Sequence, residues 1–475
     1  MSEHKQAHIK DFAGGKLHLV GIGGSSMSGL ARMLKSEGYQ VSGSDQSDGY
    51  ALSALRELGI PVAVGHHPEV AAQADLLIYS AAISSADPER QRAAELGIPQ
   101  MERAMLLGQL MAGYQQTVAV SGTHGKTTVS SMIAQVLLDC GKDPTVHIGG
   151  SLDSIGGGSR LGAKDVFVAE ACEFNRSFWH MPPTMALITN IEEDHLDCYK
   201  DIEDIEAAFQ HFVGLLPDSG VCFGLHRDAR VMRVMARSGR RYVSFDLDGE
   251  ADWTAGELSY SKTGCASFEA RYRGQPQGRV QLQVAGEFNA LHAVAALAVA
   301  YELKCDMALA CQSLSHFKGA HRRFEHTGVV QGMLMYHDYG HNPAEMQSAI
   351  NVAKMQDRRV IAVMQPHTYS RVKGLFQDYL TCTQAADITL VTDIYAAREV
   401  DPGDIHSRML VSGMREHGID AYLTPSFEDT QRWLLSHGQP GDLVLTMGCG
   451  NINLLNDRMQ ADWDRLQGNK GDIHD

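Results

Sequence analysis

The segment from Thr117 to Thr128, with the sequence TVAVSGTHGKTT, combines residue types that can bind a polyphosphate. An apolar, β-branched run ends in a turn with two glycines, and apolar residues at helical spacing follow. The backbone amides of such a turn, the positive end of the helix dipole, the Lys126 ammonium and the Thr127 hydroxyl converge on one point. This pattern predicts a loop that binds the phosphates of a nucleotide together with Mg²⁺. The candidate residues are Gly122, Thr123, His124, Gly125, Lys126, Thr127 and Thr128.

The loop is a variant of the common phosphate-binding pattern. The strict form GxxxxGK[ST] requires a glycine at the position of Val120. A glycine-rich corner with an incidental lysine is the alternative, but the predicted strand and helix on either side supply the context of a nucleotide loop. The GTHGKTT form resembles the Mur ligase family, whose members are ATP-dependent, amide-forming enzymes of bacterial cell-wall precursor synthesis.

Length and composition are typical of a multidomain globular protein. At about 150 residues per domain, the 475 residues suggest roughly three domains. The formal net charge of -16 argues against unspecific binding of nucleic acid. The first residues lack an apolar signal core, and no run approaches the ~18 apolar residues of a membrane span, so we expect a cytoplasmic protein without membrane insertion. Nine scattered cysteines without a CxxC pair predict reduced thiols.

The first third of the chain reads as a Rossmann-like unit. Strands are predicted at Leu17 to Gly21 and Gln40 to Ser44, with a helix at Met27 to Glu37 between them. The dinucleotide pattern GxGxxG is only partly met, because Ser26 occupies the third glycine position. Asp45 lies near the usual position of a ribose-binding acid, although it could simply end its strand.

The same segment resembles the amino-terminal domain of Mur ligases. The resemblance rests on the GIGGSSMSG turn, the SGSD strand end, His66 before Pro68 and the SAAIS turn. It implies that the domain holds the UDP of a sugar nucleotide rather than NAD, with pyrophosphate at a helix amino terminus. The candidate UDP-sugar residues are Gly21, Gly23, Gly24, Ser25, Ser26, Asp45, His66, Ser80, Ala81 and Ala82.

Acidic residues follow two predicted buried strands in the central third. Glu170 and Glu173 follow the first strand, and Asp194 and His195 follow the second, Met185 to Thr189. Carboxylates at these strand ends suit a Mg²⁺ nucleotide site, whereas a loop histidine is by itself more typical of the surface. The resemblance implies Thr127, Glu170 and His195 as metal ligands. Cys172 stands where the family has Asp, either as a tolerated variation or as a reactive thiol.

The rest of the central third ends in a helix and a basic pair. Alternating residues from about 218 to 284 predict antiparallel hairpins without chemistry. Asn289 is by default an amino-terminal cap of the following helix, but the resemblance implies that it reads adenine, with His292 in place of a second Asn. Arg322 and Arg323 could be a solvated linker pair, whereas the resemblance places Arg323 on the ATP phosphates.

Strand and helix alternate again in the last third, which predicts a doubly wound parallel sheet with ligand-binding turns. The resemblance assigns Asp338 to the ATP ribose and Tyr339 to the wall of the amino-acid pocket. It assigns His341 and Arg371 to the carboxylate end of the substrates. The chain departs from the family at two positions, with His337 where many members have Asp and Thr368 in place of an Arg.

Together these patterns predict three α/β domains: a Rossmann-like UDP-sugar domain at 1–113, a central ATP and Mg²⁺ domain with a mostly parallel sheet at 114–325, and a doubly wound domain at 326–475 that closes over ATP and the amino acid. The resemblance implies an ATP-dependent ligase that joins L-alanine to the lactyl carboxylate of UDP-N-acetylmuramate through an acyl phosphate. The implied catalytic residues are Lys126, Glu170, His195, Arg323, His341 and Arg371.

Three other functions remain open at this point. A sister ligase of cell-wall recycling joins a tripeptide to the same sugar nucleotide. An NAD-linked sugar-nucleotide oxidoreductase would use the first unit, and a catalytically silent UDP-sugar-binding protein would need no Mg²⁺ site. The sequence leaves open whether the protein is a monomer or a homodimer and whether L-alanine is preferred over glycine or L-serine.

Overall fold

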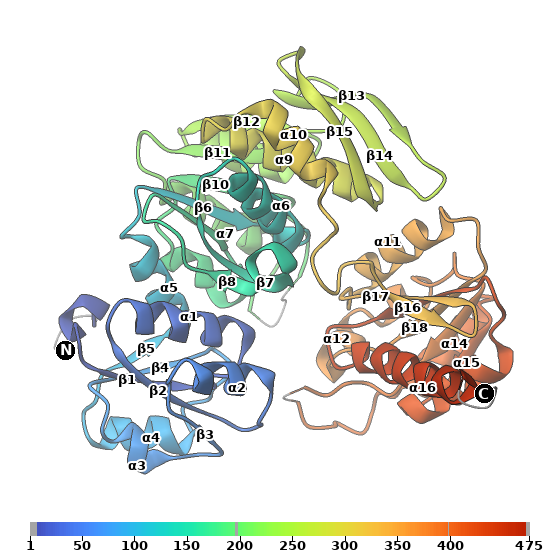
Figure 1. Cartoon of the computed structure of the whole chain (residues 1–475), viewed down its shortest axis with the longest axis horizontal. Coiled ribbons are helices and arrows are strands. Elements are labelled where there is room, and N and C mark those ends of the chain that lie inside the picture. The colour runs from blue at the N-terminus through green and yellow to red at the C-terminus, as the bar shows by residue number, and fades with distance from the viewer. Residues whose placement is uncertain (1–6, 195–197, 398, 472–475) are drawn as a thin grey trace. The chain divides into compact units, whose positions relative to one another are not determined.

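The computed structural model describes residues 7–194, 198–397 and 399–471. The chain divides into two compact units. Unit 1 consists of Met1–Leu258, Ser267–Leu282 and Glu287–Phe317, and unit 2 of Ser259–Ala266, Gln283–Gly286 and Lys318–Asp475. Three sheets organise these units (Figure 1). The three-sheet α/β architecture confirms the predicted fold class, while the boundaries predicted at 113 and 325 remain predictions.

The first sheet has the order β3-β2-β1-β4-β5 and is parallel throughout. Its strands are β1 (Lys16–Val20), β2 (Gln40–Asp45), β3 (Val62–Val64), β4 (Leu76–Tyr79) and β5 (Gln100–Glu102). The helices are η1 (Ile9–Phe12), α1 (Ser25–Ser36), α2 (Tyr50–Glu57), α3 (Pro68–Ala71), α4 (Pro88–Glu95) and α5 (Arg103–Met111). Helices on both faces of the sheet bury the central strands β1 and β4 almost throughout.

The second sheet has ten strands in the order β15-β14-β13-β12-β11-β10-β6-β9-β7-β8. The strands are β6 (Gln116–Ser121), β7 (Thr145–Leu152), β8 (Gly157–Arg160), β9 (Val166–Glu170), β10 (Met185–Ile188), β11 (Val221–Leu225), β12 (Arg241–Phe245), β13 (Trp253–Tyr260), β14 (Cys265–Tyr272) and β15 (Gln275–Ala285). From β7 to β13 each neighbouring pair is parallel, whereas β8 is antiparallel to β7. The mostly parallel sheet was predicted.

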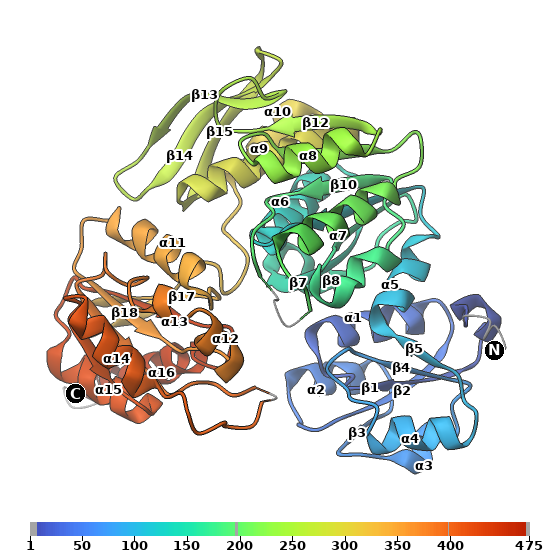
Figure 2. The ribbon, with the colours of Figure 1, turned by 180° about the vertical axis from the view of Figure 1, so that it is seen from behind.

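Helices cover both faces of this second sheet. They are α6 (Lys126–Asp139), η2 (Asp153–Ile155), η3 (Phe174–His180), α7 (Ile202–Gly214), α8 (Ala229–Arg237), α9 (Glu287–Glu302) and α10 (Met307–Ser315). Figure 1 shows α6, α9 and α10 over one face, and Figure 2 shows α7 and α8 over the other. The hairpins predicted from 218 to 284 are wrong in their first half, because α8 connects β11 to a parallel β12. The sequence of α8, ARVMRVMAR, has apolar residues at helical spacing, which favours a helix here.

The third sheet lies in unit 2 with the order β16-β17-β21-β18-β19-β20. The strands are β16 (Glu325–Val330), β17 (Met333–Asp338), β18 (Val360–Met364), β19 (Ile388–Val391), β20 (Ala421–Leu423) and β21 (Leu443–Met447). Only β16 pairs antiparallel among these strands. The helices are α11 (Pro343–Lys354), α12 (Tyr369–Gly374), α13 (Phe376–Tyr379), α14 (Ser407–Glu416), α15 (Phe427–His437) and α16 (Asn453–Gly471).

A continuous apolar core joins the first sheet to the second sheet. Buried side chains from α1, from α5 and from the segment around Met181 belong to one cluster. At their contact, a Cβ added to Gly108 of α5 would overlap the carbonyl oxygen of His180. The core of unit 2 consists of two separate clusters.

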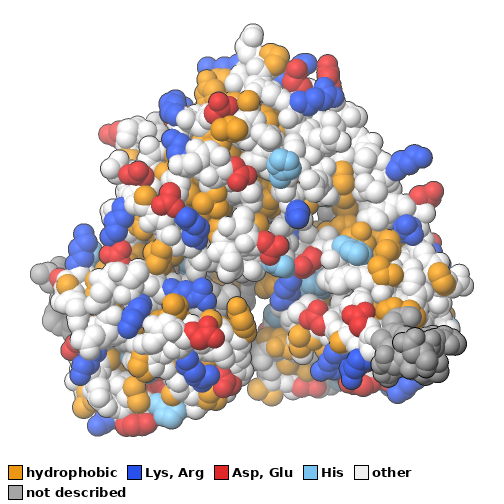
Figure 3. All heavy atoms as spheres, in the orientation of Figure 1, with side chains coloured by type: hydrophobic (Ala, Val, Ile, Leu, Met, Phe, Trp, Pro, Cys, Tyr) orange, Lys and Arg blue, Asp and Glu red, His pale blue; other side chains and the backbone are white. Residues whose placement is uncertain are grey.

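Two surface properties bear on the partners of the protein. Acidic and basic side chains are interspersed over the face drawn in Figure 3. Across the described residues, the helices are all too short or too polar to cross a membrane.

Candidate active site

The predicted nucleotide loop connects β6 to α6 as expected. Gly122 and Gly125 both have positive φ angles, of 131° and 83°. A Cβ on Gly122 would overlap the Thr189 hydroxyl, and a Cβ on Gly125 would overlap the His292 ring. Both positions therefore require glycine for backbone conformation and for space. The turn aims the amide groups at the start of α6 into the loop.

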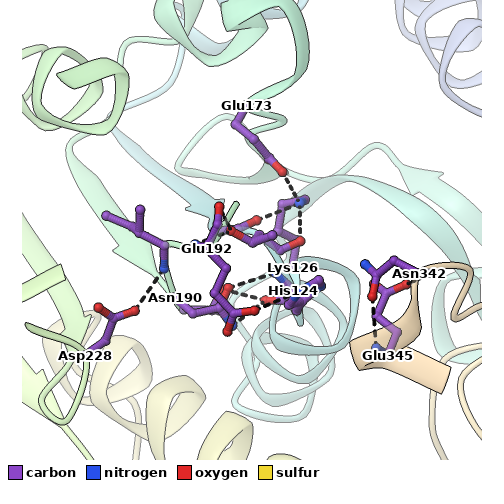
Figure 4. Close-up of polar contacts among 12 residues, drawn as sticks. His124, Lys126, Glu173, Asn190, Glu192, Asp228, Asn342 and Glu345 are labelled. Carbon is purple, nitrogen blue, oxygen red and sulfur yellow. Dashed lines mark hydrogen bonds and ion pairs between the residues drawn. The ribbon is translucent and has the colours of Figure 1, made fainter. Parts of the chain in front are cut away.

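The ammonium group of Lys126 is held inside this loop. Its Nζ donates to the carbonyl oxygens of Gly122 at 2.6 Å and Thr123 at 3.0 Å. It also forms an ion pair with Glu173 Oε1 at 3.0 Å (Figure 4). The two side chains are only 17% and 4% exposed. Burial opposes the charge of Lys126, but Glu173 foremost, and Glu170 to a smaller extent, raise its pKa above the usual value.

Residues that directly follow β10 hold the nucleotide loop in its shape. The His124 amide donates to Asn190 Oδ1 at 2.9 Å, and Thr189 Oγ1 donates to the His124 carbonyl at 2.5 Å. The Glu192 amide donates to Thr123 Oγ1 at 2.9 Å, and the Glu192 carboxylate lies 3.3 Å from His124 Nε2 (Figure 4). No role in the loop was predicted for Asn190 or Glu192. The polar run after a buried strand was the available signal.

Two of the three predicted metal ligands, Thr127 of α6 and Glu170 at the end of β9, contact one short segment of β7. A Cβ on Gly149 would lie 2.8 Å from Glu170 Oε2, and one on Gly150 would lie 2.6 Å from Thr127 Cγ2. Glu170 is also close enough to influence the pKa of Lys126. A hydroxyl and a carboxylate are the hard oxygen donors that Mg²⁺ prefers, so these residues fit that ion.

His195, the third predicted ligand, lies outside the described residues. Within the described ranges, His, Cys, Asp and Glu side chains form no group of three or more that could hold a metal ion. The metal assignment therefore remains a prediction.

Cys172 lies beside this site and has a suppressed reactivity. Burial, and then the Glu173 carboxylate, raise the pKa of its thiol to about 11, with Lys126 opposing them. The thiolate is the reactive form of cysteine. The structure therefore favours a tolerated variation over a reactive thiol at this position.

The predicted adenine residues lie at the start of α9. The helix begins at Glu287 after Gly286, which has a φ angle of 102°, so Asn289 is inside the first turn. The default expectation that Asn289 caps the helix is therefore wrong. His292 is 9% exposed and packs directly against Gly125, at the start of the loop helix.

The first glycine turn has the geometry expected for a phosphate site. Gly21 has a φ angle of 74°, and Gly24 precedes the amino terminus of α1. The Gly23 amide donates to Asp45 Oδ2 at 2.9 Å. Asp45, at the end of β2, therefore helps to shape the glycine turn that follows β1, which is a role apart from ribose binding.

Ser26, at the third glycine position, connects the first sheet to the second. Its Oγ lies 2.7 Å from His147 Nε2 and accepts a hydrogen bond from Arg103 Nη1 at 2.9 Å. Burial, and then the Arg103 charge, lower the pKa of His147 to about 3. A neutral His147 and a charged Arg103 beside the turn were missed, because these residues are far apart in the sequence and carry no motif.

The remaining UDP-sugar candidates lie at neighbouring strand ends of the first sheet. His66 Nδ1 lies 3.3 Å from Asp87 Oδ2. The segment from Ser80 to Ala82 follows β4, and the Ile83 amide closes its turn on the Ser80 carbonyl at 2.9 Å. Ser25 begins α1. The structure thus gathers the candidates at one edge of the first sheet, where open α/β sheets bind ligands.

A second group of candidates lies in unit 2, around the Tyr339 ring. The guanidinium carbons of Arg322 and Arg323 lie 4.8 and 4.9 Å from the centre of this ring. Asp338 accepts the amides of Phe324 at 2.8 Å and Gly340 at 2.7 Å. Burial raises the pKa of Asp338, and the Arg323 charge foremost opposes this. Arg323 and Asp338 are therefore neighbours, as candidates for one nucleotide would be.

Arg322 has a structural role instead. Its guanidinium donates to His337 Nε2 at 3.1 Å and to the carbonyls of Gly448 and Gly450 at 3.1 and 2.9 Å. His337 is buried and its Nδ1 lies 3.0 Å from Thr446 Oγ1. Burial, and then Arg322, lower the pKa of His337 to about 3. Arg322 and Arg323 are therefore not a solvated linker pair.

His341 and Arg371 are connected through His367. The His341 and His367 ring centres are 5.9 Å apart, and Arg371 Nη1 lies 3.0 Å from His367 Nδ1. Tyr379 donates to the His341 carbonyl at 2.6 Å, and Asn342 caps α11 in a capping box with Glu345 (Figure 4). Tyr339 and His341 also form an edge-on ring contact at 5.8 Å. The predicted amino-acid residues therefore form one cluster in unit 2.

Three protein-family models match most of the chain. The Mur ligase family, catalytic domain, matches residues 16–115, the Mur ligase middle domain matches 120–300, and the Mur ligase, glutamate ligase domain, matches 322–450. The chain belongs to the Mur ligase family. The resemblance inferred from the loop and turn motifs is thus confirmed.

Individual relatives of this Mur ligase match over almost their whole length. The UDP-N-acetylmuramate--L-alanine ligase of Caldanaerobacter subterraneus is 42% identical over 438 residues, which cover 92% of this chain and 95% of the relative. The crystal structure of the UDP-N-acetylmuramate-alanine ligase of Thermotoga maritima matches with a TM-score of 0.81 and 27% identity, over 96% and 100% of the two chains. A murein peptide ligase from Psychrobacter arcticus shares the fold, with a TM-score of 0.70 at 23% identity, over 94% and 98%.

Proposed function

We propose that the chain is an ATP-dependent ligase that joins L-alanine to the lactyl carboxylate of UDP-N-acetylmuramate. The observation that carries this proposal is the buried Lys126 ammonium in the nucleotide loop, with Thr127 and Glu170 beside it. A protein that only binds a sugar nucleotide has no use for this arrangement. The 42% identity to a full-length relative named for this reaction supports the choice of substrates.

The first step is a phosphoryl transfer. The lactyl carboxylate oxygen attacks the γ-phosphorus of ATP, the bond from this phosphorus to the bridging oxygen of ADP breaks, and an acyl phosphate forms. Lys126 stabilises negative charge on the transferring group, and we assign the same role to Arg323. When bound to Thr127 and Glu170, Mg²⁺ supplies further neutralisation of the phosphate oxygens. The role of His195 as a metal ligand is part of this proposal.

The second step forms the amide bond. The amino group of L-alanine attacks the acyl carbon, the bond from carbon to the phosphate oxygen breaks, and inorganic phosphate leaves as the nitrogen loses its proton. We assign His341 and Arg371 to the carboxylate end of the substrates and Tyr339 to the wall of the amino-acid pocket. Asp338 is assigned to the ATP ribose, and Asn289 to adenine.

The first sheet is assigned to the UDP group. The Gly21 to Ser26 turn provides amides and a helix amino terminus for the pyrophosphate. Since ATP and a UDP-sugar are the substrates, we place the reaction in the cytoplasm.

Phosphate release tests the proposal directly. The full chain is incubated with ATP, Mg²⁺ and UDP-N-acetylmuramate, either without an acceptor or with L-alanine, glycine, L-serine or the tripeptide L-Ala-γ-D-Glu-meso-diaminopimelate. We expect release that requires both the sugar nucleotide and L-alanine. Release only with the tripeptide would assign the chain to cell-wall recycling. No release with any acceptor would favour the alternative of a catalytically silent UDP-sugar-binding protein.

A further inference from the structure

Two thiols meet at the ends of the helices that carry the nucleotide site. Cys140 caps the carboxyl end of α6, and Cys305 lies in the short connection from α9 to α10. Cys140 Sγ lies 3.8 Å from the carbonyl oxygen of Asp306, the residue after Cys305, so the two thiols are neighbours in the folded chain. Both thiols are free and partly exposed. A small oxidant can therefore reach this pair.

The pair lies at the far end of two parallel helices. At their amino ends, His292 of α9 packs against Gly125, which precedes α6. At their carboxyl ends, Cys140 meets Cys305, and Ser313 of α10 donates to Asp139 Oδ2 at 2.5 Å. The three helices pack against one another on one face of the second sheet (Figure 1). A covalent bond at this end would join two segments that are far apart in the sequence.

We propose that Cys140 and Cys305 are a reversible oxidation site, where a hydroperoxide or a small-molecule disulfide converts the two thiols to a disulfide that fastens α6 to α9. Because Cys140 contacts the residue next to Cys305, the bond joins two segments that already lie side by side. The cross-link stabilises unit 1 by restricting the unfolded chain across a long loop. The Lys126 loop at the opposite end keeps its geometry.

The oxidation balances with hydrogen peroxide as the oxidant. The Cys140 thiolate attacks one peroxide oxygen, the O–O bond breaks, and a sulfenic acid and hydroxide form. The Cys305 sulfur then attacks the Cys140 sulfur, the S–O bond breaks, and the oxygen leaves as water. The two thiols are oxidised by two electrons and the peroxide is reduced by two. Dithiothreitol reverses the reaction by thiol exchange.

The charges around the pair set the conditions of the test. Burial raises the pKa of both thiols, that of Cys305 to about 12. Asp139 and Asp306 add to the effect at Cys140, while the Lys142 ammonium opposes it. Since only the thiolate attacks peroxide, oxidation is carried out at about pH 8.5, where more thiolate is present.

The full-length protein is treated with hydrogen peroxide, remaining thiols are alkylated, and peptides are mapped without reduction. We expect one cross-linked peptide pair containing Cys140 and Cys305, which disappears after dithiothreitol. The variants Cys140→Ser and Cys305→Ser lack the pair, and Cys140→Ala repeats the first in case serine impairs folding. Cys265→Ser is the control, because Cys265 is also partly exposed but lies in a strand away from the pair.

Thermal unfolding supplies the second readout. Oxidised wild-type protein and oxidised Cys265→Ser should unfold at a midpoint about 5 °C higher than their reduced forms, while Cys140→Ser shows no increase. Phosphate release by the cross-linked protein should be retained. Recovery of Cys140 and Cys305 as separate alkylated or overoxidised residues, or pairing of either with another cysteine, would overturn the proposal.

Discussion

At the scale of single residues, the decisive group is the ammonium of Lys126. Two loop carbonyls and the Glu173 carboxylate hold it in place. The charge is thus positioned before a nucleotide binds, and no reorganisation is needed when charge develops on the transferring phosphoryl group. Removal of this lysine and removal of its partner should therefore have different effects.

Lys126→Ala should reduce turnover by at least about 100-fold, because it removes a preorganised cation from the phosphoryl transfer. Phosphate release in the presence of UDP-N-acetylmuramate and L-alanine measures the loss, and circular dichroism checks that the fold is kept. Lys354→Ala is the matched control, since Lys354 pairs with Asp387 at the surface. Activity near that of this control would contradict the role of Lys126.

Glu173→Gln should move the alkaline limb of the pH–rate profile to lower pH. Glu173 is the foremost group that raises the pKa of Lys126 above its ordinary value, against the effect of burial. Without the carboxylate, Lys126 loses its proton at a lower pH, and the cation is lost earlier as pH rises. The measurement is kcat/KM for ATP between neutral and alkaline pH. An unchanged alkaline limb would show that the pair does not set the charge of Lys126.

At the scale of elements, each site segment is a turn between a strand and a helix, and this pattern was readable from the sequence. The predicted strands at Gln40 to Ser44 and Met185 to Thr189 agree with β2 and β10 to within one residue. The contacts that hold these turns in place could not be predicted from the sequence. Asn190 holds the His124 amide, and Ser26 contacts His147, through pairs that meet only in the folded sheet.

The packing of α6 on α9 at the nucleotide loop can be tested with glycine variants. Gly125→Ala should destabilise the protein more than Gly141→Ala, although both glycines have positive φ angles. A Cβ at position 125 would overlap the His292 ring, whereas one at 141 would meet nothing within 4 Å. Measured by urea unfolding, Gly141→Ala should lower the free energy of unfolding by about 1–3 kcal/mol through backbone strain alone. Gly125→Ala should lower it by more.

A double-mutant cycle isolates the contact with His292. In a His292→Ala background, the cost of Gly125→Ala should fall to that of Gly141→Ala, because only the backbone strain is left. If the cost of Gly125→Ala is the same in both backgrounds, the ring contact is not what excludes a side chain.

At the scale of the whole molecule, cores rather than sequence segments define the independent units. The first two sheets share one cluster of buried side chains, whereas unit 2 has its own clusters. The sequence predicted three domains from three strand and helix patterns. Periodicity identifies the elements but not which apolar faces share a core, so the common core of the first two sheets could not be predicted.

Calorimetry should therefore resolve two unfolding transitions rather than three. Met181→Ala removes a side chain from the shared core and should lower the midpoint temperature of one transition. The expected loss of unfolding free energy is about 2–5 kcal/mol. Met335→Ala, in a cluster of unit 2, should lower the other. Three transitions, or a shift of both transitions by either variant, would contradict the division into two units.

The ion pair of Lys126 with Glu173 also bears on how the products leave. A carboxylate at 3.0 Å cancels much of the ammonium charge when the loop is empty. A lone inorganic phosphate therefore gains little from entering the loop, whereas ATP brings several phosphates that can contact the amides at the same time. The loop thus discriminates between its substrate and its smallest product, and product inhibition by phosphate should be weak.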